Sequence, residues 1–361
     1  MIGHRRGAAR RLSLVCSTIL TLLAALAPAP AAGGAFVLTF STQIGSTCAQ
    51  VSGGPVSTLH VVSLYTAEME LKDRVRVTSS ESGYVSACFT DQVASGDRLR
   101  ASVSGTTRTV TVPKLSLTID RVTDVLSGVA PAGADLQFSA YKYAGLTSTS
   151  EQRYAYATAN AAGSYSVDIS STFNLIGGDY VYGSVSVGSD YYTVSNTAGY
   201  VHVLRASPLI DGVLGQSRSA TITLMTATNA VRARAVVVGE SATGSFNGRF
   251  ITTTGIPVNA RLGDKVSGSF ASDAAFTIPD VRVSADAATD VVTGKCPPSR
   301  SYKLFARRAN YSQQVTRTGT SGPTGVFTRD LTGSLDIVAG DVLEVWCKLP
   351  TGDQVGRRGR V

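Results

Sequence analysis

Residues able to carry out acid–base or nucleophilic chemistry are scarce in this chain. His60 lies in the apolar run 59–64, and His202 stands between Val201 and Val203. A nucleophile needs a neighbouring base that is itself held in place, and the sequence offers no evident grouping of that kind. We interpret both histidines as ordinary strand residues. The sequence favours a non-catalytic protein without a cofactor or a metal site, although two carboxylates from distant strands could still form a glycosidase pair.

A covalent crosslink between lysine and asparagine is a second candidate chemistry. It requires a buried lysine, a facing asparagine and an acid. Lys142 is the candidate, because it alternates onto the same side as Leu136 and Phe138. We favour the alternative, in which Lys142 ends a strand and holds its ammonium group in water.

Tyrosine is concentrated in one stretch, since ten of the 14 tyrosines lie between Tyr141 and Tyr200. Strand alternation places several of them opposite the core-facing side: Tyr141, Tyr143, Tyr154, Tyr156, Tyr180 and Tyr182. A tyrosine ring suits stacking on sugars or contact with proteins, but tyrosine pairs also stabilise an exposed sheet by themselves. Trp346, the only tryptophan, poses the same choice between ligand binding and packing against the C-terminal tail, and we favour packing.

The first 31 residues have the pattern of a secretory signal. Four arginines precede an apolar run at 12–27, and Ala29 and Ala31 form a small-residue cleavage site. A membrane anchor is the alternative, but that run is shorter than the ~20 residues needed to span a bilayer. We expect cleavage after Ala31 and a secreted, extracellular mature chain that has no membrane span.

The charge of the chain argues against nucleic acid as a partner. The formal net charge of +8 is halved when the four arginines of the signal are removed. Binding to nucleic acid usually requires a dense basic face. One basic cluster, Arg357, Arg358 and Arg360, lies in the last five residues. We interpret it as a solvated tail, with contact to an anionic wall polymer or surface as the alternative.

Four cysteines remain in the mature chain. An exported protein meets oxidising conditions, so we expect them to pair. Three connectivities are possible, and pairing within a repeat joins Cys48 with Cys88 and Cys296 with Cys347. In the chain-entropy model each disulfide stabilises its repeat by ~3 to 4 kcal/mol.

Gly-Asp pairs recur along the chain at intervals of about 80 residues, the size of a small all-β domain. They stand at Gly96-Asp97, Gly178-Asp179, Gly263-Asp264 and Gly340-Asp341. Gly-x-aromatic elements precede three of them by 15 residues, at Gly163, Gly248 and Gly325, whereas Gly83-Tyr84 departs from this spacing. Glycine permits the positive φ of a tight turn, and aspartate can bond to nearby backbone. We interpret the pairs as turn devices, with calcium ligation as the alternative.

The elements that must position these residues are strands. Val, Thr, Tyr and Ser alternate in short runs bounded by Gly, Asn, Asp and Pro, which is typical of all-β sandwiches. We expect four domains in a semi-rigid string. After the signal at 1–31 they cover residues 32–113, 114–197, 198–280 and 281–361.

These turns and repeated elements resemble tandem bacterial immunoglobulin-like domains over essentially the whole mature chain. The resemblance implies adhesion, surface display, spacing or carbohydrate contact. Our first hypothesis is a secreted structural or adhesive repeat protein whose partner is a cell-surface glycan or protein. The alternatives are a carbohydrate-binding protein that uses the tyrosines, and a secreted hydrolase. The sequence leaves the oligomeric state open.

Overall fold

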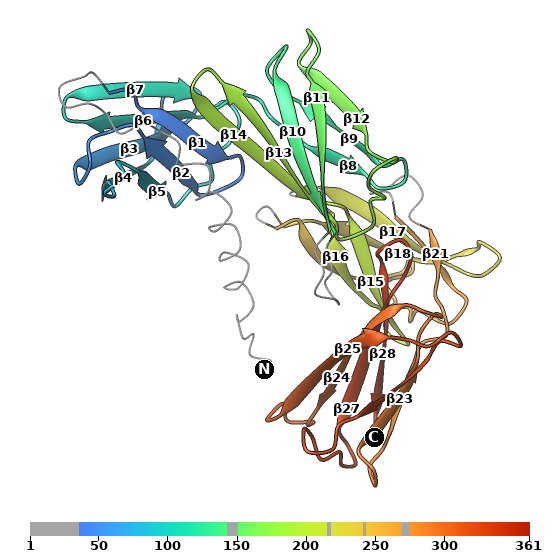
Figure 1. Cartoon of the computed structure of the whole chain (residues 1–361). Coiled ribbons are helices and arrows are strands. Elements are labelled where there is room, and N and C mark those ends of the chain that lie inside the picture. The colour runs from blue at the N-terminus through green and yellow to red at the C-terminus, as the bar shows by residue number, and fades with distance from the viewer. Residues whose placement is uncertain (1–35, 143–150, 215–217, 241–242, 269–274) are drawn as a thin grey trace. The chain divides into compact units, whose positions relative to one another are not determined.

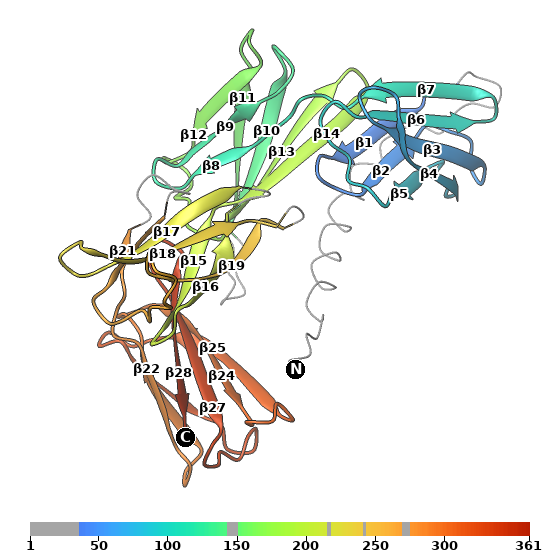
Figure 2. The same ribbon diagram turned by 180° about the vertical axis from the view of Figure 1, so that it is seen from behind.

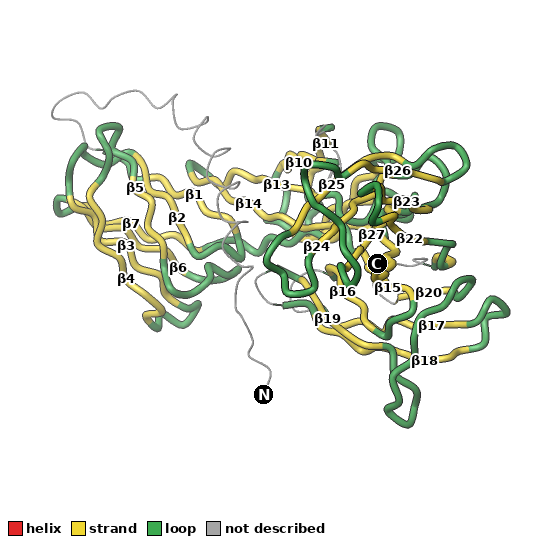
Figure 3. Tube along the Cα trace, turned by 90° about the horizontal axis from the view of Figure 1, so that it is seen from below, coloured by secondary structure: helices red, strands yellow, loops and turns green. Residues whose placement is uncertain are grey.

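The structure is a computed structural model that describes residues 36–142, 151–214, 218–240, 243–268 and 275–361. All regular elements within these ranges are strands, joined by turns and loops (Figure 3). No helix among the described residues is long and apolar enough to cross a membrane. The predicted all-β fold of tandem immunoglobulin-like repeats is confirmed. The expected secretory signal lies outside the described residues.

The chain forms two compact units, and the division falls between Val112 and Pro113. The first unit has two layers, with strand orders β1-β2-β5 and β4-β3-β6-β7. Alternating residues such as Phe40, Val51 and Leu64 are buried, because each strand turns every second side chain towards the other layer. The strands are β1 (Thr39–Gln43), β2 (Cys48–Ser52), β3 (Leu59–Tyr65), β4 (Leu71–Thr78), β5 (Val85–Cys88), β6 (Arg98–Val103) and β7 (Thr106–Thr111).

The second unit contains three successive sets of seven strands, which we call the second, third and fourth strand groups (Figure 1). The second group pairs its strands as β12-β9-β8 and β11-β10-β13-β14. Figure 2 shows both layers from the opposite side. Its strands are β8 (Thr118–Asp120), β9 (Val125–Val129), β10 (Asp135–Tyr141), β11 (Gln152–Thr158), β12 (Ser164–Asp168), β13 (Tyr180–Val187) and β14 (Asp190–Thr197).

The third and fourth groups repeat this layout. The third comprises β15 (Tyr200–Arg205), β16 (Leu209–Val213), β17 (Ser219–Met225), β18 (Val231–Val238), β19 (Ser245–Arg249), β20 (Lys265–Gly268) and β21 (Phe276–Thr277). The fourth comprises β22 (Arg282–Asp286), β23 (Val291–Lys295), β24 (Ser301–Arg307), β25 (Gln314–Thr320), β26 (Val326–Asp330), β27 (Val342–Lys348) and β28 (Gln354–Arg360).

The last strand corrects one expectation from the sequence. Arg357, Arg358 and Arg360 do not form a solvated tail, because they belong to β28, which pairs antiparallel with β27. Arg358 lies 2.6 Å from the carboxylate of Glu344, which is itself largely buried. Pairing with two neighbouring strands outweighs the weak intrinsic strand propensity of this Gly- and Arg-rich segment.

The Gly-Asp pairs are turn devices, as predicted. Each glycine has a φ between 81° and 94°, and each aspartate amide donates to the carbonyl three residues earlier, which is the pattern of a type II turn. The carboxylates accept hydrogen bonds from the amides of the same four residues: Ala94 to Asp97 (2.8 Å), Ile176 to Asp179 (2.9 Å), Arg261 to Asp264 (2.8 Å) and Val338 to Asp341 (3.1 Å). The side chain therefore closes the turn that starts the sixth strand of each group.

All four aspartates are buried, and each is paired with a cation that the sequence did not indicate. The pairs are Lys72–Asp97 (2.8 Å), Lys142–Asp179 (2.9 Å), Arg232–Asp264 and Arg308–Asp341 (2.7 Å). The expectation that Lys142 holds its ammonium group in water is wrong, because Nζ meets the fully buried Asp179 carboxylate. Lys142 also donates to the main-chain carbonyl of Asn174. A lysine–asparagine crosslink would need the asparagine side chain, which is not the partner in that bond.

One Gly-x-aromatic assignment needs correction. Tyr165 pairs with Gly128, and Phe327 with Gly294, so that each ring lies over a glycine of the neighbouring strand. In the third group the equivalent ring is Phe246, which pairs with Gly212. Gly244, with a φ of 69°, is therefore the equivalent turn glycine. Gly248, which shares the 15-residue spacing, lies inside β19 instead.

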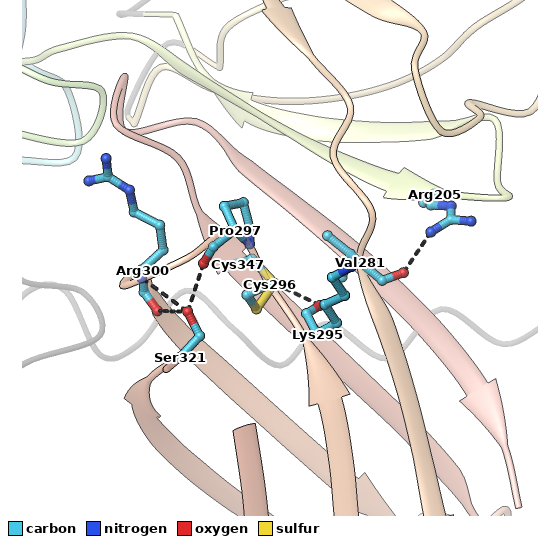
Figure 4. Close-up of a disulfide and its surroundings, with 8 residues drawn as sticks. All are labelled: Arg205, Val281, Lys295, Cys296, Pro297, Arg300, Ser321 and Cys347. Carbon is cyan, nitrogen blue, oxygen red and sulfur yellow. Dashed lines mark hydrogen bonds between the residues drawn. A yellow bond between two sulfur atoms is a disulfide. The ribbon is translucent and has the colours of Figure 1, made fainter. Parts of the chain in front are cut away.

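Both expected disulfides are present, and they connect different parts of the sandwich. Cys48 and Cys88 are cross-strand partners of β2 and β5 within one sheet. Cys296 follows β23, whereas Cys347 lies on β27, so this disulfide joins the two layers of the fourth group (Figure 4). Beside it, the Ser321 hydroxyl donates to the Pro297 carbonyl at 2.7 Å, which fixes the adjoining turn.

Candidate functional site

The tyrosine-rich stretch forms one face of the sheet β11-β10-β13-β14. Cross-strand pairing places Ser139 between Tyr154 and Tyr182. In the next row Tyr141 lies between Gln152 and Tyr180. Directly paired residues point to the same side of a sheet, so these side chains share one surface. We call it the tyrosine face, defined by Gln137, Ser139, Tyr141, Gln152, Tyr154, Tyr156, Tyr180 and Tyr182.

Alternation along the strands produces this face. Leu136, Phe138 and Ala140 are buried in the core, so the intervening residues of β10 face away from it. On β13 the core side carries Val181 and Gly183. A Cβ at Gly183 would lie 2.9 Å from the Phe138 ring, so glycine at this position makes room for the aromatic core beneath the sheet.

The edge of the face is its most accessible part. Tyr154 and Tyr156 lie on the edge strand β11 and are 53% and 68% exposed. Tyr141, Tyr180 and Tyr182 lie on interior strands and are only half-buried. A partner approaching the sheet would therefore meet Tyr154 and Tyr156 first, with the other three rings behind them.

Hydrogen bonds hold the rings in position. The Gln152 amide donates to the Tyr141 hydroxyl at 2.8 Å and to the Tyr154 hydroxyl at 2.9 Å. The ring centroids of Tyr141 and Tyr180 lie 6.3 Å apart in a tilted arrangement, which is within the range of favourable aromatic pairs. A surface whose rings are held before binding loses less side-chain entropy when a ligand arrives.

The eight residues that define the face are tyrosine, serine and glutamine, and the charged residue next to them is Asp135, which pairs with Thr158 beyond Gln137 and Tyr156. Burial raises the pKa of the Tyr182 hydroxyl well above its ordinary value. A tyrosine hydroxyl is protonated at physiological pH even with its ordinary pKa, so the hydroxyls of this face can both donate and accept hydrogen bonds. Flat rings with neutral donors and acceptors suit a neutral polyhydroxylated ligand better than a charged one.

Three other tyrosines of the stretch are not part of the tyrosine face defined above. Tyr143 lies outside the described residues. Tyr165 and Tyr192 come from the same tyrosine-rich stretch but belong to the core, where the Tyr165 hydroxyl donates to the Ser116 carbonyl at 2.6 Å. That the other five tyrosines bind a ligand stays a prediction.

Trp346 lies on a different strand group and is packed by its neighbours. Its indole nitrogen donates to Glu344 at 2.7 Å, and its ring lies against Gly356 of β28, where a Cβ would come within 2.7 Å. The ring centroid of His202 is 5.5 Å away. Packing against the C-terminal segment, the alternative favoured from the sequence, agrees with these contacts.

The two histidines among the described residues lie in unlike surroundings. His60 is fully buried, and burial lowers the pKa of its imidazole. His202 is partly exposed, and its Nδ1 lies 2.7 Å from Asp211 Oδ1. A carboxylate at this distance can orient the His202 imidazole. The aromatic rings next to His202, however, are those of Tyr200 and Trp346, and a catalytic triad would need a serine or cysteine nucleophile there.

Comparison with known proteins gives no family for the chain. No family model matches, and no curated protein matches. Among solved structures, a tetra-tandem repeat from the extending region of a large adhesion protein is 15% identical, with a TM-score of 0.18, and covers 90% of this chain and 99% of that one. The BSP domain of a biofilm-associated protein is 7% identical at a TM-score of 0.18, covering 91% and 96%.

A structure of a bacterial ice-binding adhesin is similar to the same extent. It is 13% identical at a TM-score of 0.18, and the alignment covers 90% of this chain and 96% of that one. Values this low identify no relative. The functional argument therefore rests on the residues and contacts of the chain itself.

Proposed function

We propose that the chain is a secreted, non-catalytic structural or adhesive protein of the bacterial cell surface or extracellular space. Its architecture supports this proposal: strand groups follow one another through short connectors, and each starts its sixth strand at an equivalent ion pair between a buried aspartate and a lysine or arginine. The two disulfides fit an oxidising compartment. Such a chain is suited to span distance and to present surfaces, and we propose the boundaries 32–113, 114–197, 198–280 and 281–361 for its domains.

Fractionation of producing cells tests this proposal. The chain should appear outside the cytoplasm without residues 1–31, and part of it should remain bound to washed cells. Intact mass identifies the amino terminus, and non-reducing peptide mapping identifies the disulfides. A cytoplasmic chain that keeps its first 31 residues would contradict the proposal.

A second candidate function is carbohydrate binding by the tyrosine face. One observation favours it: Tyr154 and Tyr156 are exposed side by side on an edge strand, and the Gln152 amide holds the hydroxyls of Tyr154 and of Tyr141 behind it. Aromatic rings stack on the apolar faces of sugars, while hydroxyl and amide groups reach the sugar hydroxyls. Neutral cell-surface glycans are the expected ligands.

Binding to a panel of neutral polysaccharides tests this second function. Tyr154→Ala with Tyr156→Ala should abolish binding without changing the unfolding midpoint. Tyr311→Ala is a matched control, because Tyr311 is 69% exposed but lies outside the tyrosine face. If the double variant binds as the wild type does, or if Tyr311→Ala weakens binding equally, the tyrosine face is not the site.

A further inference from the structure

Strands β15 and β28 lie side by side and run parallel, although residues 206–353 separate them along the chain. The pairing joins His202–Arg205 of the third group to Gln354–Arg357 of the fourth. Because of it, the sheets β19-β16-β15 and β28-β27-β24-β25 form one seven-stranded sheet. The first strand of one group is thus hydrogen-bonded to the last strand of the next.

The apolar core continues across this pairing. One cluster of buried residues includes Val203 and Ile210 of the third group and Val345 and Val355 of the fourth. Val203 and Val355 are themselves paired residues, and both are fully buried. Separating the two strands would therefore expose apolar surface as well as break hydrogen bonds.

The N-terminal ends of the two strands are fastened by Asp353. This fully buried carboxylate accepts a hydrogen bond from the Val201 amide at 2.8 Å, one residue into β15, while β28 begins immediately after Asp353. Its other oxygen lies 3.0 Å from the guanidinium of Arg121 in the second group. Removal of either Arg121 or Asp353 would leave the charge of the other buried without its ion-pair partner, which is strongly destabilising.

The turn before β28 fits closely against the second group. Arg121 also donates to the Thr351 carbonyl at 2.7 Å, and the Gly177 amide donates to the same carbonyl at 2.7 Å. Gly352 has a φ of 86°, and a Cβ there would lie 2.2 Å from the Gly177 carbonyl oxygen. Backbone meets backbone at this point, so a glycine is required.

The C-terminal ends of the two strands are also connected. Arg357 of β28 donates to the carbonyl of Arg205, the last residue of β15, at 3.4 Å. Arg205 in turn donates to the Val281 carbonyl at 2.8 Å (Figure 4). It also pairs with Asp280 at 3.0 Å. The short parallel ladder is therefore held at both ends by side chains.

We propose that β15 and β28 form a mechanical clamp that carries tension past the rest of the third and fourth groups. Only Ala198 and Gly199 separate β14 from β15, so a pull transmitted by β14 reaches the N-terminal end of β15. A pull applied to the chain after β28 reaches the C-terminal end of that strand. In a parallel pair, opposed forces at these two ends slide the strands along each other and load all the ladder hydrogen bonds together. Residues 206–353 carry no load until the ladder breaks.

The direction of pulling gives a test that leaves the buried contacts intact. Full-length chains with Cys16→Ser carry one handle at the C-terminus and a second on an introduced cysteine. With Thr197→Cys the pull shears the ladder, whereas with Ala206→Cys it acts at the same end of both strands and peels the ladder one bond at a time. Single-molecule extension then compares the rupture forces, which depend on the barrier to unfolding.

Shearing should require several-fold more force than peeling. With the Thr197 handle no lengthening should precede the rupture of the ladder. While Cys296–Cys347 is intact, about 100 of the roughly 150 residues between the strands then become extensible, by ~330 Å. Reduction of Cys296–Cys347, whose cysteines are 51 residues apart, should lengthen that release by ~180 Å. Equal forces in the two geometries would overturn the proposal. The proposal would also be overturned if the third group unfolded by itself, before the release of chain that becomes longer when Cys296–Cys347 is reduced.

Discussion

The ammonium group of Lys142 lies 2.9 Å from the carboxylate of Asp179, which is fully buried, while the lysine side chain remains 24% exposed. The same aspartate accepts the Ile176 amide, so one carboxylate both closes a turn and neutralises a cation. An equivalent arrangement occurs at Asp97, Asp264 and Asp341. The repeated unit is therefore defined by a turn together with its counter-charge.

Asp179→Asn should lower the free energy of unfolding of the second unit by about 3 kcal/mol, because it removes one partner of a buried ion pair. Urea denaturation followed by circular dichroism measures the loss. Asp135→Asn is the control, since Asp135 is exposed and its carboxylate accepts a hydrogen bond from the Thr158 hydroxyl at the surface. It should change stability by less than about 0.5 kcal/mol. Similar losses for the two variants would contradict the role given to Asp179.

Gly352→Ala should disrupt the junction between the second and fourth groups, because its Cβ would collide with the Gly177 backbone. Gly333→Ala is a matched control in the fourth group: Gly333 has a φ of 73°, but a Cβ there meets nothing within 4 Å. The control should cost about 1 kcal/mol from backbone strain alone. Trp346, the only tryptophan, lies against β28 and reports the change by fluorescence. Equal effects of the two substitutions would show that close contact at Gly352 is not needed.

The first unit should lose stability as the pH falls below about 6.5, the ordinary pKa of histidine. Burial lowers the pKa of His60 in the folded state, and the backbone carbonyl of Pro55, which acts as an acceptor for the imidazole, opposes this shift in part. The unfolded chain then binds the proton more readily than the folded chain, so stability rises with pH across this range.

Amide hydrogen exchange of Leu59–Tyr65 at pH 7.5 and 5.5 measures this effect. Protection should decrease at the lower pH in the wild type, and the decrease should be smaller in His60→Leu, whose side chain cannot be protonated. An equal decrease in both proteins would assign the pH dependence to other groups.

Replacement of Cys296 and Cys347 by alanine should cost about 4 kcal/mol in the chain-entropy model, because the closed loop constrains the unfolded chain. The loss should be visible as a lower urea midpoint of the second unit. Reductant should not change the urea midpoint of the second unit in the alanine variant. In the wild type, reductant should lower that midpoint to the value of the variant. A wild type whose midpoint is the same with and without reductant would contradict this stabilising role.

Strand alternation was sufficient to predict the tyrosine face. The period of two along β10 and β13 separates Phe138 and Val181 from Tyr141 and Tyr180 without knowledge of the neighbouring strands. The sequence did not show that Tyr165 and Tyr192 face the core. Their burial depends on how the two layers pack together, which the sequence does not reveal. The relative exposure of the tyrosines depended on β11 being an edge strand.

The counter-charges of the Gly-Asp turns could not be read from the sequence. The basic residues precede their aspartates by 25, 37, 32 and 33 residues, so no constant spacing identifies them. They come from the hairpin between the third and fourth strands, whose length varies from group to group. The constant spacing that the sequence does show at Gly248 is coincidental, because the equivalent turn glycine is Gly244.

The pairing of β15 with β28 was also beyond sequence reasoning. Gly356 and Gly359 give the last segment the composition of a flexible tail. Those glycines serve close packing instead, since a Cβ at Gly356 would meet the Trp346 ring. Contacts between residues 150 positions apart decide the conformation of such a segment, and local propensity does not contain them.

Adhesion of the producing cells under flow tests the proposed function most directly. Deletion of the gene should lower the number of cells retained on a glycan-coated or cell-coated surface, and wild-type chain supplied in trans should restore it. Chain carrying Tyr154→Ala with Tyr156→Ala should restore it less than chain carrying Tyr311→Ala if the tyrosine face makes the contact. Equal retention of cells with and without the chain, on every surface tested, would contradict an adhesive role.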